Sequence, residues 1–90
     1  MQINKSKLET IMEILNIKIQ SKLEDGNITI LTTDKPSKTM LVEFIYNMNN
    51  NSLNIVKVHN ELYYNDVLNM VNKNLKMIVR DTVYFANGGE

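Results

Sequence analysis

Hydrophobic and polar residues alternate along the stretch Leu15–Glu24. One set of alternate positions reads Leu15, Ile17, Ile19, Ser21 and Leu23, and the positions between them carry polar or charged side chains. This two-residue period is the pattern of a strand with one buried face. The stretch runs into Asp25-Gly26, a dipeptide typical of type I′ turns, in which both central residues need positive φ. The sequence therefore predicts a β-hairpin around this dipeptide.

A register test supports the hairpin. With Asp25-Gly26 as the loop, one face pairs Leu23 with Ile28, Ser21 with Ile30 and Ile19 with Thr32. The other face pairs Glu24 with Asn27, Lys22 with Thr29 and Lys18 with Thr33. The first face is mainly apolar and the second mainly polar, as a half-buried sheet requires. The alternative is one long helix through this stretch, since Ile19 and Leu23 also continue a helical stripe that begins upstream.

Upstream of the hairpin, a helical pattern covers residues 7 to about 15. Ser6-Lys7-Leu8-Glu9 matches the capping box, in which a serine and a glutamate satisfy two free amides at a helix start. Spacings of i, i+3, i+4 and i+7 relate Leu8, Ile11, Met12 and Leu15. We therefore expect a helix that ends near Asn16.

Two further strands are predicted after a loop at Asp34–Lys38, where Pro36 removes an amide donor. Met40–Met48 is rich in β-branched and aromatic residues and has apolar positions on both faces, which indicates a central strand. Asn49–Asn51 predicts a turn, because asparagine tolerates left-handed backbone angles. Ser52–Val58 then returns as the next strand.

The register of this second hairpin is left open by the sequence. A three-residue loop places Val42 opposite Val58, Glu43 opposite Lys57 and Phe44 opposite Val56. A two-residue loop places Tyr46 opposite Leu53 and Phe44 opposite Ile55. The charge pair in the first register favours it slightly.

A second helix and a last strand complete the predicted fold. The helical stripe comprises Tyr64, Val67, Leu68, Val71 and Leu75, and Asn60 or Asn65 could cap its start. From Met77 to Phe85 the odd positions are apolar apart from Asp81, which predicts a strand. We therefore expect one α+β domain over residues 1–90. It would hold a mainly antiparallel sheet with two helices on one face, in the order α-β-β-β-β-α-β.

Composition narrows the classes of function. Ten basic residues balance ten acidic ones, so no net field attracts the chain to nucleic acid or anionic lipid. The absence of cysteine excludes disulfides, thiol catalysis and cysteine-based zinc sites. No apolar run has the length of a membrane span or a signal core, which leads us to expect a cytoplasmic protein. The fourteen asparagines and nine lysines resemble the usage of AT-rich bacterial or phage genomes.

The chain shows no set of residues with the pattern of a catalytic site. His59, the single histidine, forms His-x-Glu with Glu61 but lacks the cysteine half of a zinc-deaminase signature. Glu9 and Glu13 are four residues apart, a spacing that solvated helix faces commonly show. We therefore expect no enzymatic activity, no cofactor and no metal.

A binding function is the remaining hypothesis. We expect a small protein-binding module, of the kind that a phage or mobile element encodes as an inhibitor or accessory factor. Tyr63 should point away from the stripe that contains Tyr64, and exposed tyrosine is enriched at interface hot spots. The other candidate contact residues are Ile14, which lies off the stripe of the first helix, and Lys35 and Lys38, which flank Pro36-Ser37 in a loop.

Two alternatives stay open. A basic cluster of Lys73, Lys76 and Arg80 near the end of the second predicted helix would serve a small nucleic-acid-binding protein. Nucleic acid is not the partner that we expect first, because the charge is balanced and lysine also favours helix C-termini. A ligand-sequestering protein would need a pocket, which so short a chain could form between two protomers. Self-association would also add buried area to a small core.

Overall fold

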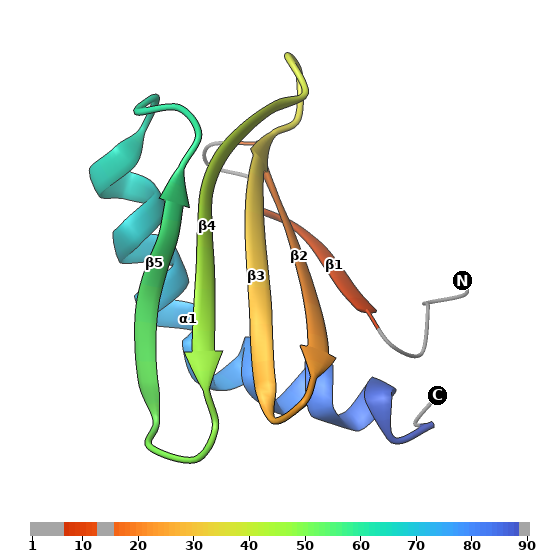
Figure 1. Ribbon diagram of the computed structural model, residues 1–90. Helices are drawn as coiled ribbons and strands as arrows, with labels where there is room; N and C mark the ends of the chain where they lie inside the picture. Colours follow the sequence, from red (N-terminus) through yellow and green to blue (C-terminus); the bar gives the residue numbers. More distant parts are fainter. Residues whose placement is uncertain (1–6, 13–15, 89–90) are drawn as a thin grey trace.

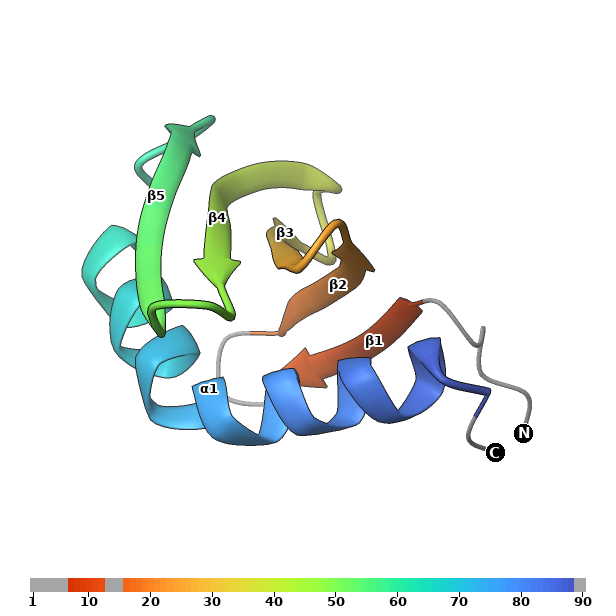
Figure 2. The same ribbon diagram turned by 60° about the horizontal axis from the view of Figure 1, so that its bottom comes forward.

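The computed structural model describes residues 7–12 and 16–88 of the chain. Five strands precede one helix: β1 (Lys7–Met12), β2 (Ile17–Glu24), β3 (Asn27–Asp34), β4 (Thr39–Asn47), β5 (Ser52–Val58) and α1 (Tyr64–Ala86). The strands form one antiparallel sheet in the order β1-β2-β3-β4-β5, so every strand pairs with its neighbours in sequence (Figure 1). Figure 2 shows that the sheet is strongly curved and that α1 runs along its inner side and passes beside β1.

The β2–β3 hairpin is confirmed with the register that the sequence predicts. Leu23 pairs with Ile28, and Ser21 pairs with Ile30. Asp25 and Gly26 both have positive φ, at 52° and 77°, as a type I′ turn requires. The alternative prediction, one long helix through this stretch, is therefore wrong.

The predicted first helix is wrong, because Lys7–Met12 forms strand β1. Its register places Leu8, Thr10 and Met12 opposite Ser21, Ile19 and Ile17. The helical spacing and the capping box are local signals, whereas pairing with β2 adds a ladder of backbone hydrogen bonds along a strand that would otherwise be an edge. Ser6 and residues 13–15, on which the helix prediction also depended, lie outside the described residues.

The predicted second helix and last strand are one helix, α1, so the predicted order α-β-β-β-β-α-β with two helices is wrong. The buried stripe continues through the region expected to be a strand, and comprises Val67, Val71, Ile78 and Thr82. The two-residue alternation after Met77 does not end the helix, because no glycine or proline lies between Tyr64 and Asn87. The fold is a β-meander followed by a single C-terminal helix.

Both candidate registers of the β4–β5 hairpin occur, on either side of a β-bulge. Near the turn, Tyr46 pairs with Leu53 and Phe44 pairs with Ile55. Beyond the bulge, Glu43 pairs with Lys57, and Val56 is the additional residue between the two registers. The sequence could not distinguish the two registers, because each of them is correct for half of the hairpin.

A second bulge lies in β4, between the pairs Leu31–Glu43 and Thr33–Met40. It brings two consecutive residues, Leu41 and Val42, into the core. The Thr32 hydroxyl satisfies the backbone at this point, since it donates to the Val42 carbonyl (2.8 Å) and accepts from the Val42 amide (3.0 Å). The bulge therefore lets β4 bury two successive residues on the same side of the sheet.

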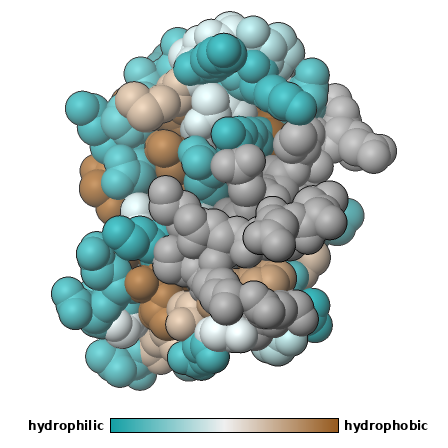
Figure 3. Space-filling model, turned by 90° about the vertical axis from the view of Figure 1, so that its right-hand side faces the viewer, coloured by the Kyte–Doolittle hydropathy of each residue, from teal (hydrophilic) through white to brown (hydrophobic). Residues whose placement is uncertain are grey.

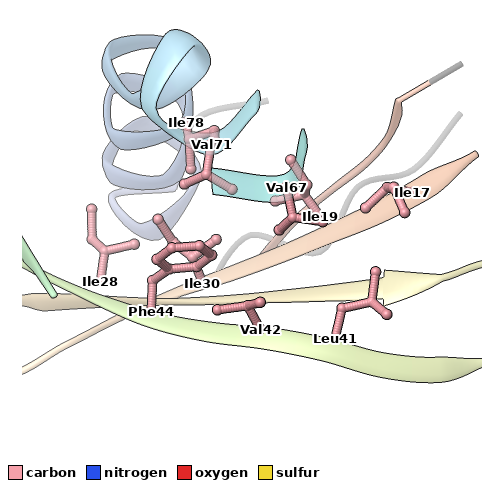
Figure 4. Close-up of a cluster of buried hydrophobic side chains, with 10 residues drawn as sticks. All are labelled: Ile17, Ile19, Ile28, Ile30, Leu41, Val42, Phe44, Val67, Val71 and Ile78. Carbon is pink, nitrogen blue, oxygen red and sulfur yellow. The ribbon is translucent and has the colours of Figure 1, made fainter. Parts of the chain in front are cut away.

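The core lies between the sheet and α1 (Figure 4). Its ten fully buried apolar side chains are Ile17, Ile19, Ile28, Ile30, Leu41, Val42, Phe44, Val67, Val71 and Ile78. Each such side chain contributes roughly 1.5–3 kcal/mol when buried, so this cluster is the main source of stability. Seen from the β1 side, the described surface is mainly hydrophilic around scattered hydrophobic residues (Figure 3).

The helix α1 is bent near its middle, so its two halves run in different directions (Figures 1 and 2). Two side chains in this part bond the carbonyl four residues earlier: Asn72 Nδ2 donates to Leu68 (2.9 Å), and Asn74 Nδ2 donates to Met70 (2.8 Å). Such bonds compete with the helix ladder and favour bending. The bend lets one helix follow a curved sheet. Within residues 7–12 and 16–88, no helix is long and apolar enough to cross a membrane.

Candidate functional site

An exposed apolar surface lies where β5 continues into α1. We call it the β5 surface and define it by four residues with similar exposed fractions: Ile55 (42%), Val58 (39%), Leu62 (42%) and Tyr63 (43%). A hollow of about 400 Å³ lies at the strand end of this surface and is lined by Val58 together with Glu61 and Tyr64. Exposed large apolar residues that gather in one place mark interaction sites more often than scattered ones do.

The β5 surface is exposed because the helix does not cover β5. Ile55 and Val58 pair with Phe44 and Val42, which are both buried, so they belong to the core side of the sheet. α1 packs against β1, β2, β3 and β4. The last strand therefore extends the inner face of the sheet past the strands that α1 contacts, and in Figure 1 the first half of α1 is seen to the left of β5.

Tyr63 occupies a strained backbone position at the start of α1. It is the N-cap residue, with φ 57° and ψ 27°, and its side chain makes no capping hydrogen bond. Neither asparagine predicted to cap this helix does so at the N-cap, since Asn60 Oδ1 instead accepts the amide of Leu62 (2.8 Å). A left-handed conformation costs a residue with a Cβ about 1–2 kcal/mol. Strain of this kind is often retained where function requires it.

Two acidic residues lie close in sequence to the helix part of the β5 surface. Glu61 lines the hollow, and Asp66 lies in the first turn of α1. Both residues are exposed. A partner with a basic group beside its apolar contact residues would match these two charges.

The open edge of β5 carries two features that oppose strand-to-strand pairing. The bulge at Val56 interrupts the ladder, and Lys57 places a charge on the strand. Natural sheets use bulges and edge lysines to prevent edge-to-edge association. The β5 surface is therefore better suited to side-chain contacts on its inner face than to addition of a strand.

The structure does not place the other predicted contact residues beside Tyr63. Ile14 lies outside the described residues. Lys35 and Lys38 are exposed on the β3–β4 turn, which projects separately from the sheet (Figure 1). This turn is held by Asp34, whose carboxylate accepts the Ser37 hydroxyl (2.5 Å).

His59 is held against β4 by two contacts. Its Nε2 lies 3.2 Å from Glu43 Oε1, and its amide donates to the Leu41 carbonyl (2.7 Å). Among the residues that the structure describes, no group of three His, Cys, Asp or Glu side chains could hold a metal ion. The pair therefore ties the end of β5 to β4.

The basic cluster lies on one stripe of α1, because Lys73, Lys76 and Arg80 are at i, i+3 and i+7. Lys76 and Arg80 line an open groove beside the β4–β5 turn, and Lys73 does not. The structure thus divides the predicted cluster into two groove residues and one residue outside the groove.

Sequence reasoning missed Ile55, Val58 and Leu62 as surface residues. The sequence predicts two helices on one face of the sheet but does not show which strands they leave uncovered. One signal was present: β5 has apolar residues in both alternating sets, at Ile55, Val56 and Val58, as a strand with a bulge can show. Comparison of the chain with protein-family models, with curated proteins and with solved structures finds no match.

Proposed function

We propose that the protein acts by binding another protein through the β5 surface, with Tyr63 as the central contact. The observation that carries this proposal is that Tyr63 combines exposure with a left-handed backbone at a helix start. Asparagine or glycine would be favoured there by the backbone alone. A large aromatic side chain at such a position is explained if its contacts with a partner matter.

The partner would present an apolar segment with a basic residue beside it. The apolar part would enter the hollow at Val58 and Tyr64, and the basic residue would lie near Glu61. Tyrosine at the centre of an interface commonly carries a large share of the binding free energy. An inhibitory or accessory role in the cytoplasm, without catalysis, stays a prediction from the sequence.

Affinity capture with matched variants tests this function. The tagged protein and three variants, Tyr63→Asn, Leu62→Asp and Met40→Asp, would be exposed to a lysate of the source cells. Met40 is the control, because it is also an exposed apolar residue (46%) but pairs with Thr33 on the opposite face of the sheet from Ile55 and Val58.

The proposal expects a captured protein that the Met40→Asp variant retains and that the other two variants lose. The captured protein would then be purified, and its affinity for each variant would be measured. A partner that binds all four proteins equally would contradict the assignment of the surface. So would the absence of any captured protein.

A further inference from the structure

We propose that a second site, separate from the β5 surface, binds a small organic anion. We call it the α1 groove. It lies between the β4–β5 hairpin and the second half of α1, and its lining residues are Tyr46, Asn51, Leu75, Lys76, Val79 and Arg80. In this proposal Lys76 and Arg80 hold the anionic group, and Leu75 and Val79 contact an apolar or aromatic body.

The groove has the size and composition of a small-molecule site. Its volume is about 450 Å³, within the range of roughly 300–1,000 Å³ that ligand pockets show. Its lining combines two aliphatic side chains and a tyrosine with three polar or charged groups. Pockets for organic ligands generally have an apolar lining with a few polar groups that fix orientation.

The charge at the groove is positive. The residues that the β4–β5 hairpin contributes to the lining are Tyr46 and Asn51, and neither carries a charge. Asp81 is paired with Arg80 through Nε (3.1 Å). Because guanidinium has further N–H donors at its outer end, this pairing leaves a fork that can bind a carboxylate or phosphate. The side chain of Arg80 is 76% exposed and therefore accessible.

Tyr46 and Asn51 form a polar end to the groove. The Tyr46 hydroxyl donates to Asn51 Oδ1 (2.8 Å). Since Oδ1 accepts this bond, the amide nitrogen of Asn51 is the end that can donate to a ligand. Asn51 has a φ of 57°, which fixes it in the turn at a conformation that asparagine tolerates. The groove thus offers three donors to an anion: a lysine, an arginine and an amide.

Phosphates and carboxylates share the required chemistry, so the test uses both. Isotope-labelled protein would be titrated with adenosine monophosphate, with benzoate, and with adenosine and inorganic phosphate as fragments that lack one half of the ligand. We expect saturable shifts of the Leu75 and Val79 methyl signals with adenosine monophosphate, benzoate or both. The fragments should bind more weakly, because each makes only part of the contacts.

Variants of the basic stripe make the test specific. Arg80→Gln and Lys76→Gln should each raise the dissociation constant about tenfold, as expected for the loss of one charged hydrogen bond. The matched control is Lys73→Gln, on the same stripe but outside the groove, which should change the constant by less than about twofold because its charge is screened by salt.

Two results would overturn this inference. One is the absence of saturable shifts at the groove with both anions up to about 10 mM. The other is an equal loss of affinity in the Lys73→Gln variant, which would indicate general attraction to positive charge. Binding at the α1 groove is measured independently of binding at the β5 surface. A negative result at the groove therefore leaves the proposed protein-binding function unchanged.

Discussion

Ser21 and Thr82, which are 61 positions apart in the sequence, are joined by a buried hydrogen bond of 2.7 Å between their hydroxyl groups. Both side chains are almost fully inaccessible, at 2% and 0% exposure. The Thr82 hydroxyl itself donates to the Ile78 carbonyl in the preceding turn of α1. Because one hydroxyl has one proton, Ser21 must be the donor to Thr82. This chain of two bonds fixes the second half of α1 over β2.

We predict that Thr82→Val destabilises the protein by about 1–3 kcal/mol, because it leaves the buried Ser21 hydroxyl without its acceptor. Ser21→Ala should cost less, about 0.5–1.5 kcal/mol, because Thr82 still donates to the Ile78 carbonyl. The free energy of unfolding would be measured by urea denaturation. The double variant should cost much less than the sum of the two single variants, since both polar groups are then removed together. Additive losses would show that the two hydroxyls are not coupled.

The bulge in β4 gives a second prediction. Thr32→Val keeps the shape of the side chain but removes the partner of the Val42 amide and carbonyl. We expect a loss of about 1–3 kcal/mol in unfolding free energy and faster hydrogen exchange at the Val42 amide. Thr33→Val is the control, because Thr33 is only partly buried and belongs to the opposite face; its effect should stay within about 0.5 kcal/mol. Equal effects would contradict the role of Thr32.

The β2–β3 turn gives a third prediction. Gly26→Ala should destabilise the protein by about 1–2 kcal/mol, because a residue with a Cβ is strained at a φ of 77°. A Cβ at this position would meet nothing within 4 Å, so the backbone alone is responsible. Thermal unfolding would measure the change, with Asp25→Asn as a control that should be close to neutral. An unchanged melting temperature for Gly26→Ala would exclude the type I′ turn.

Sequence reasoning succeeded where local signals and tertiary structure agree. In the β2–β3 hairpin, the alternation and Asp25-Gly26 both indicate the same register. The N-terminal prediction was wrong because Leu8, Ile11 and Met12 have helical spacing, and only pairing with β2 makes the segment a strand. The C-terminal prediction was wrong because the apolar residues from Met77 to Phe85 fit both periods. This segment is helical because its buried residues continue the stripe of α1 that contains Val71 and Ile78.

Only part of the candidate site could be predicted from the sequence. The paired tyrosines predict that one faces the core and the other does not, and Tyr63 is the exposed one. The left-handed backbone of Tyr63 depends on where α1 begins. The exposure of Ile55 and Val58 depends on how far α1 covers the sheet. Neither can be inferred without the tertiary arrangement of β5 and α1.

The strain at Tyr63 gives a fourth prediction. Tyr63→Asn should raise the free energy of unfolding by about 1 kcal/mol, because asparagine tolerates the positive φ of this position. Tyr63→Phe keeps the backbone strain and should leave stability nearly unchanged. Urea denaturation of the two variants measures the difference. A less stable Tyr63→Asn variant would show that the tyrosine contributes to folding and is not retained for binding.

The central claim is that Tyr63 is retained for contact with a partner at the expense of stability. The most direct test is the affinity of the Tyr63→Asn variant for the purified partner, measured by calorimetry beside the parent protein. We predict that this better-folded variant binds at least about tenfold more weakly, as expected for an interface hot spot. Unchanged affinity in a folded Tyr63→Asn protein would contradict the claim.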